Sequence, residues 1–139
     1  MANISVIYFS KGRDLKIVSS IVSEICGVEA IDMSKPHSLE PTDLLFIGID
    51  ARSGKTDQAV MDYLEMLPAN SIMGAALFSV SKDGKDYTEF VSAQLMHKGI
   101  TMYPKNLVIK SSSLFSKLKV EDLNKVRVYT ETVLNSFNG

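Results

Sequence analysis

Five residues after the first apolar segment have the types and spacing to bind a phosphate group. Ser10-Lys11-Gly12-Arg13-Asp14 supplies a hydroxyl, two cations and a glycine between the apolar run 4–9 and a segment of helical periodicity. Unpaired backbone N–H groups and the positive end of the helix dipole lie at such a helix start. The sequence therefore predicts an anion site at this loop.

Asp14 is the residue of this loop that works against a phosphate. Aspartate is a favoured N-cap, so the Asp14 carboxylate could occupy the N–H groups that the phosphate needs. It would also repel the phosphate by like charge. Lys11 and Arg13 could offset the repulsion, because cations bind phosphate strongly and arginine does so through two nitrogens. The residues alone leave the balance open.

Two further polar loops follow predicted strands. One contains Asp50, Ala51, Arg52, Ser53 and Gly54, and the other contains Ser81, Lys82, Asp83, Gly84 and, at its end, Tyr87. Ligands of open α/β sheets bind beyond the carboxyl ends of the strands, where the strand order reverses. We therefore expect these two loops to meet the Ser10 loop at one edge of a sheet.

The elements that must position these loops follow from hydrophobic periodicity. Strands are expected at 4–9, 28–33, 44–49, 75–80 and 107–109, with an extended stretch at 100–103 before the last one. Helices are expected at 14–26, 57–67, 87–98 and 120–137, while two prolines make 34–42 a poor helix. In the first helix the apolar residues share one face and Ser19, Ser20, Ser23 and Glu24 point away from it.

The alternation of strands and helices predicts one α/β domain of 139 residues, a doubly wound parallel sheet covered by helices on both faces. Segment 44–49 is continuously apolar, which is typical of a parallel strand buried on both faces.

The chain resembles a flavodoxin of the short type over nearly its whole length. Tyr8 to Val18 is similar to the strand, phosphate loop and helix of that family, Asp43 to Gly48 to its third strand, and Gly74 to Ser79 with Leu95 to Ile100 to its fourth strand and following helix. The resemblance implies a five-stranded, three-layer flavodoxin-like sheet of order 2-1-3-4-5. It also implies FMN as cofactor and electron transfer to a redox partner protein or a small electron acceptor.

Carried over by position, the resemblance assigns three groups of residues to FMN. Ser10, Lys11, Gly12, Arg13, Asp14 and Leu15 would surround the phosphate, Asp50 to Gly54 would lie on one face of the ring, and Ser81 to Tyr87 would approach its other side. FMN performs the redox step itself, so no catalytic acid or base is needed.

The chain departs from the family pattern in two places. Asp14 stands where a threonine hydroxyl is usual, in a loop one residue shorter, and Ala51 and Arg52 replace the usual ring-stacking aromatic. Arg52 near the ring would favour the anionic reduced form. Two function classes therefore stay open: an FMN-binding electron-transfer protein, or a flavodoxin-like interaction module with lost or weak FMN binding.

Other chemistries have less support. Gly54-Lys55-Thr56 ends like a Walker A loop, but the first glycine that the motif requires is missing at position 49. His37 and His97 lack the spacing of metal ligands. Cys26 precedes Gly27 at a helix end, which indicates a buried structural thiol.

Composition and charge narrow the function classes further. The net charge of −1 and the scattered cations argue against nucleic acid, and no apolar run reaches the length of a membrane span. The first residues lack the pattern of a signal peptide, so we expect a cytoplasmic protein.

Overall fold

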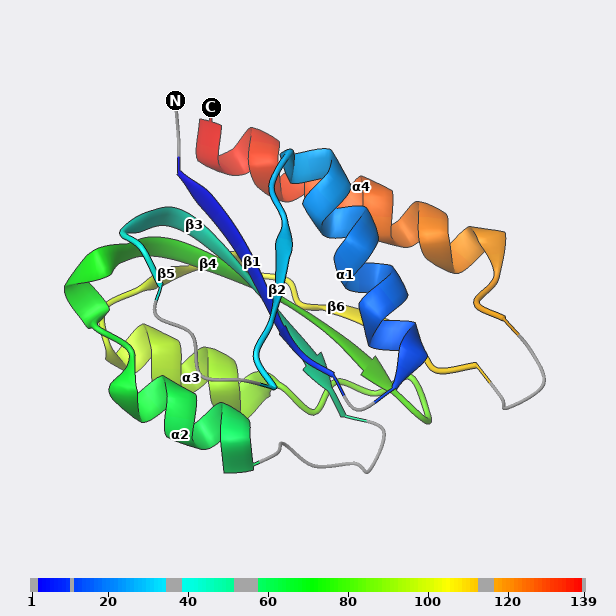
Figure 1. Ribbon diagram of the computed structural model, residues 1–139, viewed down its shortest axis with the longest axis horizontal. Helices are drawn as coiled ribbons and strands as arrows, with labels where there is room; N and C mark the ends of the chain where they lie inside the picture. The colour runs from blue at the N-terminus through cyan, green and yellow to red at the C-terminus, as the bar shows by residue number, and fades with distance from the viewer. Residues whose placement is uncertain (1–2, 11, 35–38, 52–57, 113–116, 139) are drawn as a thin grey trace.

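The computed structural model describes residues 3–10, 12–34, 39–51, 58–112 and 117–138. Strands β1 (Ile4–Phe9), β2 (Ala30–Asp32), β3 (Thr42–Asp50), β4 (Ile72–Ser81), β5 (Thr101–Met102) and β6 (Leu107–Lys110) form one sheet. Helices α1 (Arg13–Cys26), α2 (Gln58–Met66), α3 (Glu89–His97) and α4 (Val120–Asn138) flank it, with a short 3-10 turn, Ala69–Ser71, before β4. The fold is the expected three-layer α/β domain (Figure 1).

The strand order confirms the prediction of 2-1-3-4-5. The neighbours run β2-β1-β3-β4, all parallel, and the fifth position is shared by β5 and β6, which pair with different parts of β4. Gly74 pairs with Thr101 near the start of β4, and Val80 pairs with Ile109 near its end. The extended stretch expected at 100–103 is thus a strand of the sheet.

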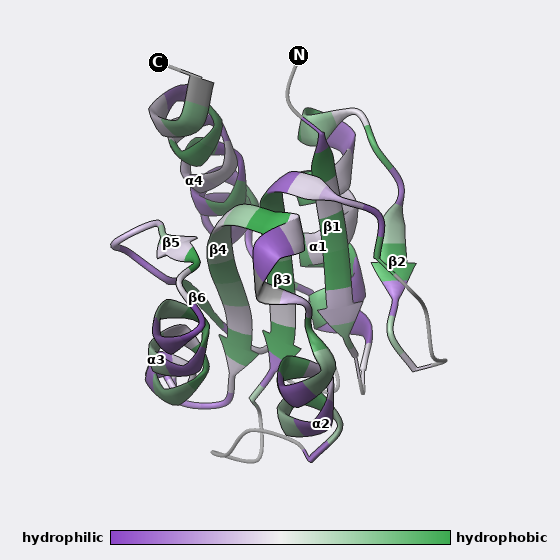
Figure 2. Ribbon diagram, turned by 90° about the vertical axis from the view of Figure 1, so that its left-hand side faces the viewer, coloured by the Kyte–Doolittle hydropathy of each residue, from purple (hydrophilic) through white to green (hydrophobic). Residues whose placement is uncertain are grey.

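Helices α1 and α4 lie on one face of the sheet, and α2 and α3 lie on the other (Figure 1). Each face has its own apolar core, since alternate residues of the central strands point in opposite directions. Val6, Phe46 and Phe78 pack beneath α1 and α4, whereas Ile7, Ile47 and Leu77 pack beneath α2 and α3. Figure 2 shows these central strands as predominantly apolar between helices with one polar side.

Gly48 lets the two central strands pack closely. A Cβ at this position would overlap the ring of Phe78, which is itself fully buried. Gly27 has a different role: it adopts a left-handed conformation (φ 72°) at the end of α1, and its N–H donates to the carbonyl of Glu24. The predicted stop of the first helix is confirmed.

The buried side of α1 is wider than its apolar stripe. Ser19 and Ser23, expected to point away from the core, are buried, with exposed fractions of 0% and 9%. The prediction was wrong because α1 packs against α4 as well as against β1, β2 and β3. The Ser23 hydroxyl donates to the carbonyl of Ser20 at 2.9 Å, whereas the buried Ser19 hydroxyl has no hydrogen-bond partner among the described residues.

The helix expected at 120–137 is α4, and it buries an apolar stripe. Val126, Thr130 and Val133 are fully buried, and Leu123, Leu134 and Phe137 pack against the same core. Among the described helices, none has the length and apolar character needed to cross a membrane.

Candidate functional site

The parallel strands bring the ends of the predicted loops to one edge of the sheet, next to the start of α1 (Figure 1). Of the predicted site residues, Lys11, Arg52, Ser53 and Gly54 lie outside the described residues, as do Lys55 and Thr56. The other predicted site residues lie within the described ranges.

The described residues before α1, Ser10 and Gly12, bond to each other, and neither provides a side chain that caps the helix. Gly12 is the N-cap in an extended conformation (φ −158°, ψ −178°), and it makes no side-chain hydrogen bond to the first turn. The Ser10 hydroxyl donates to the Gly12 carbonyl at 2.6 Å and accepts from the Gly12 N–H at 3.2 Å. The dipole of α1 therefore ends at a glycine, where an anion can approach the backbone closely.

Asp14 is not the N-cap of α1, so that interpretation was wrong. It is the second residue of the helix, 4% exposed, and its carboxylate accepts hydrogen bonds from Ser112 instead. The Ser112 N–H donates to Oδ2 at 2.8 Å, and the Ser112 hydroxyl lies 2.9 Å from Oδ2 and 3.0 Å from Oδ1. We refer to this contact between α1 and the segment after β6 as the Asp14–Ser112 latch.

Arg13 places a positive charge beside the latch. Its Nη2 donates to the Ser112 hydroxyl at 3.3 Å, and its Nε lies 3.6 Å from Asp14 Oδ1. The side chain is 53% exposed, so this ion pair adds little stability. The guanidinium does place a cation next to the Asp14 carboxylate at the start of α1, where it reduces the net negative charge that an incoming anion would meet.

Leu15 contributes to this region only through its backbone. Its side chain is fully buried in the core beneath α1, so it anchors the first turn of the helix to the sheet. The Leu15 side chain is therefore not accessible to a ligand.

The loop between β4 and α3 is held by Asp83. Its carboxylate accepts from the Lys85 N–H at 3.0 Å and from the Tyr87 hydroxyl. The hydrogen bond between Tyr87 and Asp83 is the largest cause of two pKa shifts: it lowers the pKa of Asp83 and raises the pKa of Tyr87. Gly84 provides the left-handed turn (φ 78°) that brings Asp83 and Tyr87 together.

Ser81 and Tyr87 mark the two ends of this loop. The buried Ser81 hydroxyl donates to the Lys85 carbonyl at 2.8 Å, while Lys82 is exposed. Tyr87 was expected to begin the helix, but α3 starts at Glu89. The helix starts later because the Asp86 carboxylate holds Thr88 in a turn. It accepts hydrogen bonds from the N–H (2.8 Å) and the hydroxyl (2.6 Å) of Thr88, just before the first helical residue.

Asn106 also holds the β4–α3 loop in place, a role that the sequence did not reveal. Its side-chain amide donates to Asp86 Oδ2 at 3.1 Å and ties the β5–β6 connection to the β4–α3 loop. An asparagine in a predicted loop gives no signal of such a contact.

At the end of β3, Asp50 and Ala51 are almost completely buried. The Ala51 N–H donates to the carbonyl of Val80 at 2.8 Å, which extends the pairing of β3 with β4 past the strand end. Three features therefore meet at this edge of the sheet. They are the start of α1 with Ser10, Gly12 and Arg13, the end of β3, and the β4–α3 loop, in which Tyr87 is hydrogen-bonded to Asp83.

No family model matches the chain, and no curated protein matches it in sequence. Solved structures do match in fold over nearly the whole length. A flavodoxin from Archaea matches with a TM-score of 0.74 at 13% identity, covering 98% of this chain and 99% of its own. A flavodoxin, WrbA-like protein from Agrobacterium tumefaciens matches with a TM-score of 0.79 at 14% identity, covering 99% of this chain and 98% of its own.

A third match is oxidised Flavodoxin 2 from Bacillus cereus, with a TM-score of 0.70 at 13% identity, covering 97% of this chain and 99% of its own. Identities this low establish the fold and nothing finer. Together with the observed strand order, these matches show that the chain has the flavodoxin-like fold.

Proposed function

We propose that this chain binds FMN at the edge between the start of α1 and the β4–α3 loop, and that it serves in electron transfer. The observation that carries the proposal is the N-terminus of α1, where the N-cap is Gly12, the described residues provide no capping side chain, and the Arg13 guanidinium lies close by. Amide donors, a nearby guanidinium and a glycine without a Cβ form a donor set that suits a phosphate.

Asp14 is compatible with this role because of its partners. The latch turns both carboxylate oxygens toward Ser112, so the carboxylate is satisfied by donors other than the first-turn amides of α1. Its charge remains close to the phosphate position, and the Arg13 guanidinium offsets part of it. The residues at the start of α1 therefore suit the phosphate group of FMN.

On the ring side, the chain would supply position and electrostatics. Bound FMN supplies the redox chemistry by taking up and giving back electrons. The hydrogen bond to Asp83 restricts the hydroxyl end of Tyr87, which limits the positions open to the aromatic ring that follows β4. The Asp83 carboxylate, with its lowered pKa, keeps a negative charge on this loop near neutral pH.

The partner would be a redox protein or a small electron acceptor. A net charge of −1 gives little long-range attraction for a basic partner protein. A flavodoxin-like interaction module with weak or lost FMN binding is the second candidate, and one observation favours it: a carboxylate lies in the first turn of α1.

A parallel titration with FMN and riboflavin separates the two candidates. We expect the chain to quench the fluorescence of FMN saturably and to bind riboflavin more weakly, because riboflavin lacks the phosphate. Arg13→Glu should weaken FMN binding about tenfold or more and leave riboflavin binding unchanged. Arg127→Glu, an exposed arginine on α4, is the matched control and should change neither. A chain that binds neither flavin is the interaction module.

A further inference from the structure

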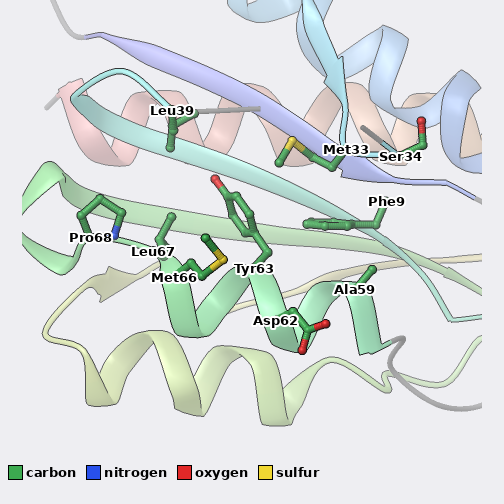
Figure 3. A pocket seen from close by; sticks show the side chains of 10 residues that line it. All are labelled: Phe9, Met33, Ser34, Leu39, Ala59, Asp62, Tyr63, Met66, Leu67 and Pro68. Atoms are coloured by element: carbon green, nitrogen blue, oxygen red, sulfur yellow. The ribbon is translucent and has the colours of Figure 1, made fainter. Parts of the chain in front are cut away.

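A second site lies beside α2, on the face of the sheet opposite α1. It is a pocket of about 470 Å³. Figure 3 shows Tyr63 of α2 next to Phe9 of β1, with Met33 and Leu39 contributed by the chain between β2 and β3. The remaining lining residues are Ser34, Ala59, Asp62, Met66, Leu67 and Pro68.

The pocket lies beside the connection from β2 to β3. This chain must pass β1, and such crossovers usually carry a helix that covers the strands beneath. The described residues of this connection, 33–34 and 39–41, form no helix. They contribute Met33, Ser34 and Leu39 to the lining of the pocket.

The chemistry of the lining is apolar and aromatic. Phe9 and Tyr63 meet edge to face, with ring centroids 5.6 Å apart and planes at 63°. Met33 and Met66 add flexible, polarisable side chains, which favour contact with aromatic rings. Among the described residues that line the pocket, Asp62 is the one with a charge, and its carboxylate disfavours an anionic ligand.

The dimensions of the pocket decide what kind of occupant it can take. A helix about 10 Å across with a pitch of about 5.4 Å fills about 420 Å³ in each turn, so a partner helix would fit for roughly one turn. A volume of about 470 Å³ is instead in the range of small-molecule sites.

We propose that the pocket between Phe9, Met33 and Tyr63 binds a neutral, largely aromatic small molecule. The ligand stacks or meets edge to face with the Phe9 and Tyr63 rings, and Met33 and Met66 close around it. None of the described lining residues belongs to the proposed FMN site, although Phe9 directly precedes Ser10, so the proposal rests on the pocket residues and not on FMN.

N-phenylnaphthylamine, a neutral aromatic dye that becomes fluorescent in apolar surroundings, tests the proposal on the full-length chain. Met66→Glu is the test variant, because Met66 lines the pocket and is 83% exposed, so the chain should still fold. Met96→Glu is the matched control: Met96 is 61% exposed, lies in the last turn of neighbouring α3, and does not line the pocket. Both changes place a carboxylate at the same kind of helix position.

We expect saturable binding of one dye per chain, weakened about tenfold or more by Met66→Glu and within about twofold of the original chain for Met96→Glu. Circular dichroism checks that both variants are folded. Absence of saturable binding, or equal weakening by both variants, would overturn the proposal. A dimer of the original chain that Met66→Glu dissociates would also overturn it, since a second copy would then be the occupant.

Discussion

The carboxylate of Asp14 accepts hydrogen bonds from both the backbone N–H and the hydroxyl of Ser112, 98 residues further along the chain. The contact ties the segment after β6 to the first turn of α1, at the edge where the strands end. It gives Asp14 a structural partner at the position where the family pattern has a threonine. The phosphate end of the proposed site and the end of the sheet are thus joined by one buried carboxylate.

Asp14→Asn should lower the free energy of unfolding by about 1–3 kcal/mol. An asparagine keeps the shape but loses one acceptor oxygen and the charge that strengthens both bonds from Ser112. Urea denaturation measures the change. Glu121→Gln is the matched control, since Glu121 is the second residue of α4 and exposed, and we expect a change of less than about 0.5 kcal/mol. Equal effects in both variants would mean that the latch adds nothing beyond the helix dipole.

The predictable part of the fold is the part that depends on periodic patterns. Continuous apolar runs gave β1, β3 and β4, and helical spacing gave α1 and α4, because burial follows the period of the backbone. The order of the strands was implied by the resemblance to short flavodoxins, and the observed pairing confirms it. The split of the fifth position into β5 and β6 was only partly visible, since a two-residue strand carries almost no pattern.

The site was less predictable because its contacts join distant residues. Ser112 lies in a run of three serines, a pattern typical of a flexible or capping loop, yet its pairing with Asp14 depends on where β6 ends relative to α1. Asn106 is a similar case, since only the folded chain brings it to Asp86. The aromatic pocket joins side chains of β1, the β2–β3 connection and α2, which come together only in the folded chain.

The Tyr87–Asp83 hydrogen bond predicts a pH dependence in the β4–α3 loop. Because the folded pKa of Asp83 is lowered, its stabilising effect is present above the ordinary value of 3.8 and is lost as the pH falls through the lowered pKa. Because the folded pKa of Tyr87 is raised, its contribution is present below 10.0 and is lost as the pH rises through the raised pKa.

Tyr87→Phe should therefore raise the pKa of Asp83 toward its ordinary value, since the bond from Tyr87 is the largest cause of the lowering. The carboxyl carbon shift of Asp83 in an NMR titration measures this. Tyr103→Phe, which removes a hydroxyl elsewhere, should leave the pKa where it is. An Asp83 pKa that does not move in Tyr87→Phe would show that the bond is absent in solution.

Cys26 should react slowly with thiol reagents. Burial raises the pKa of its thiol to about 11, because the charged thiolate is poorly solvated at the end of α1. Relative to an ordinary pKa of 9.0, the thiolate fraction at pH 8 is then about a hundredfold lower. Alkylation by iodoacetamide should be slower by about that factor in the folded chain than in the urea-unfolded chain. The thiol expected to be buried is only partly buried, and equal rates would show that this partial burial does not protect it.

The most direct test of the proposed FMN site is a ¹⁵N–¹H NMR spectrum recorded while FMN is added. We predict that the largest shifts fall on the amides of Arg13, Asp14 and Leu15, with further shifts in the Ser81–Tyr87 loop, and that riboflavin leaves the first group nearly unchanged. Spectra in which the α1 amides stay in place while FMN is present in excess would contradict the account.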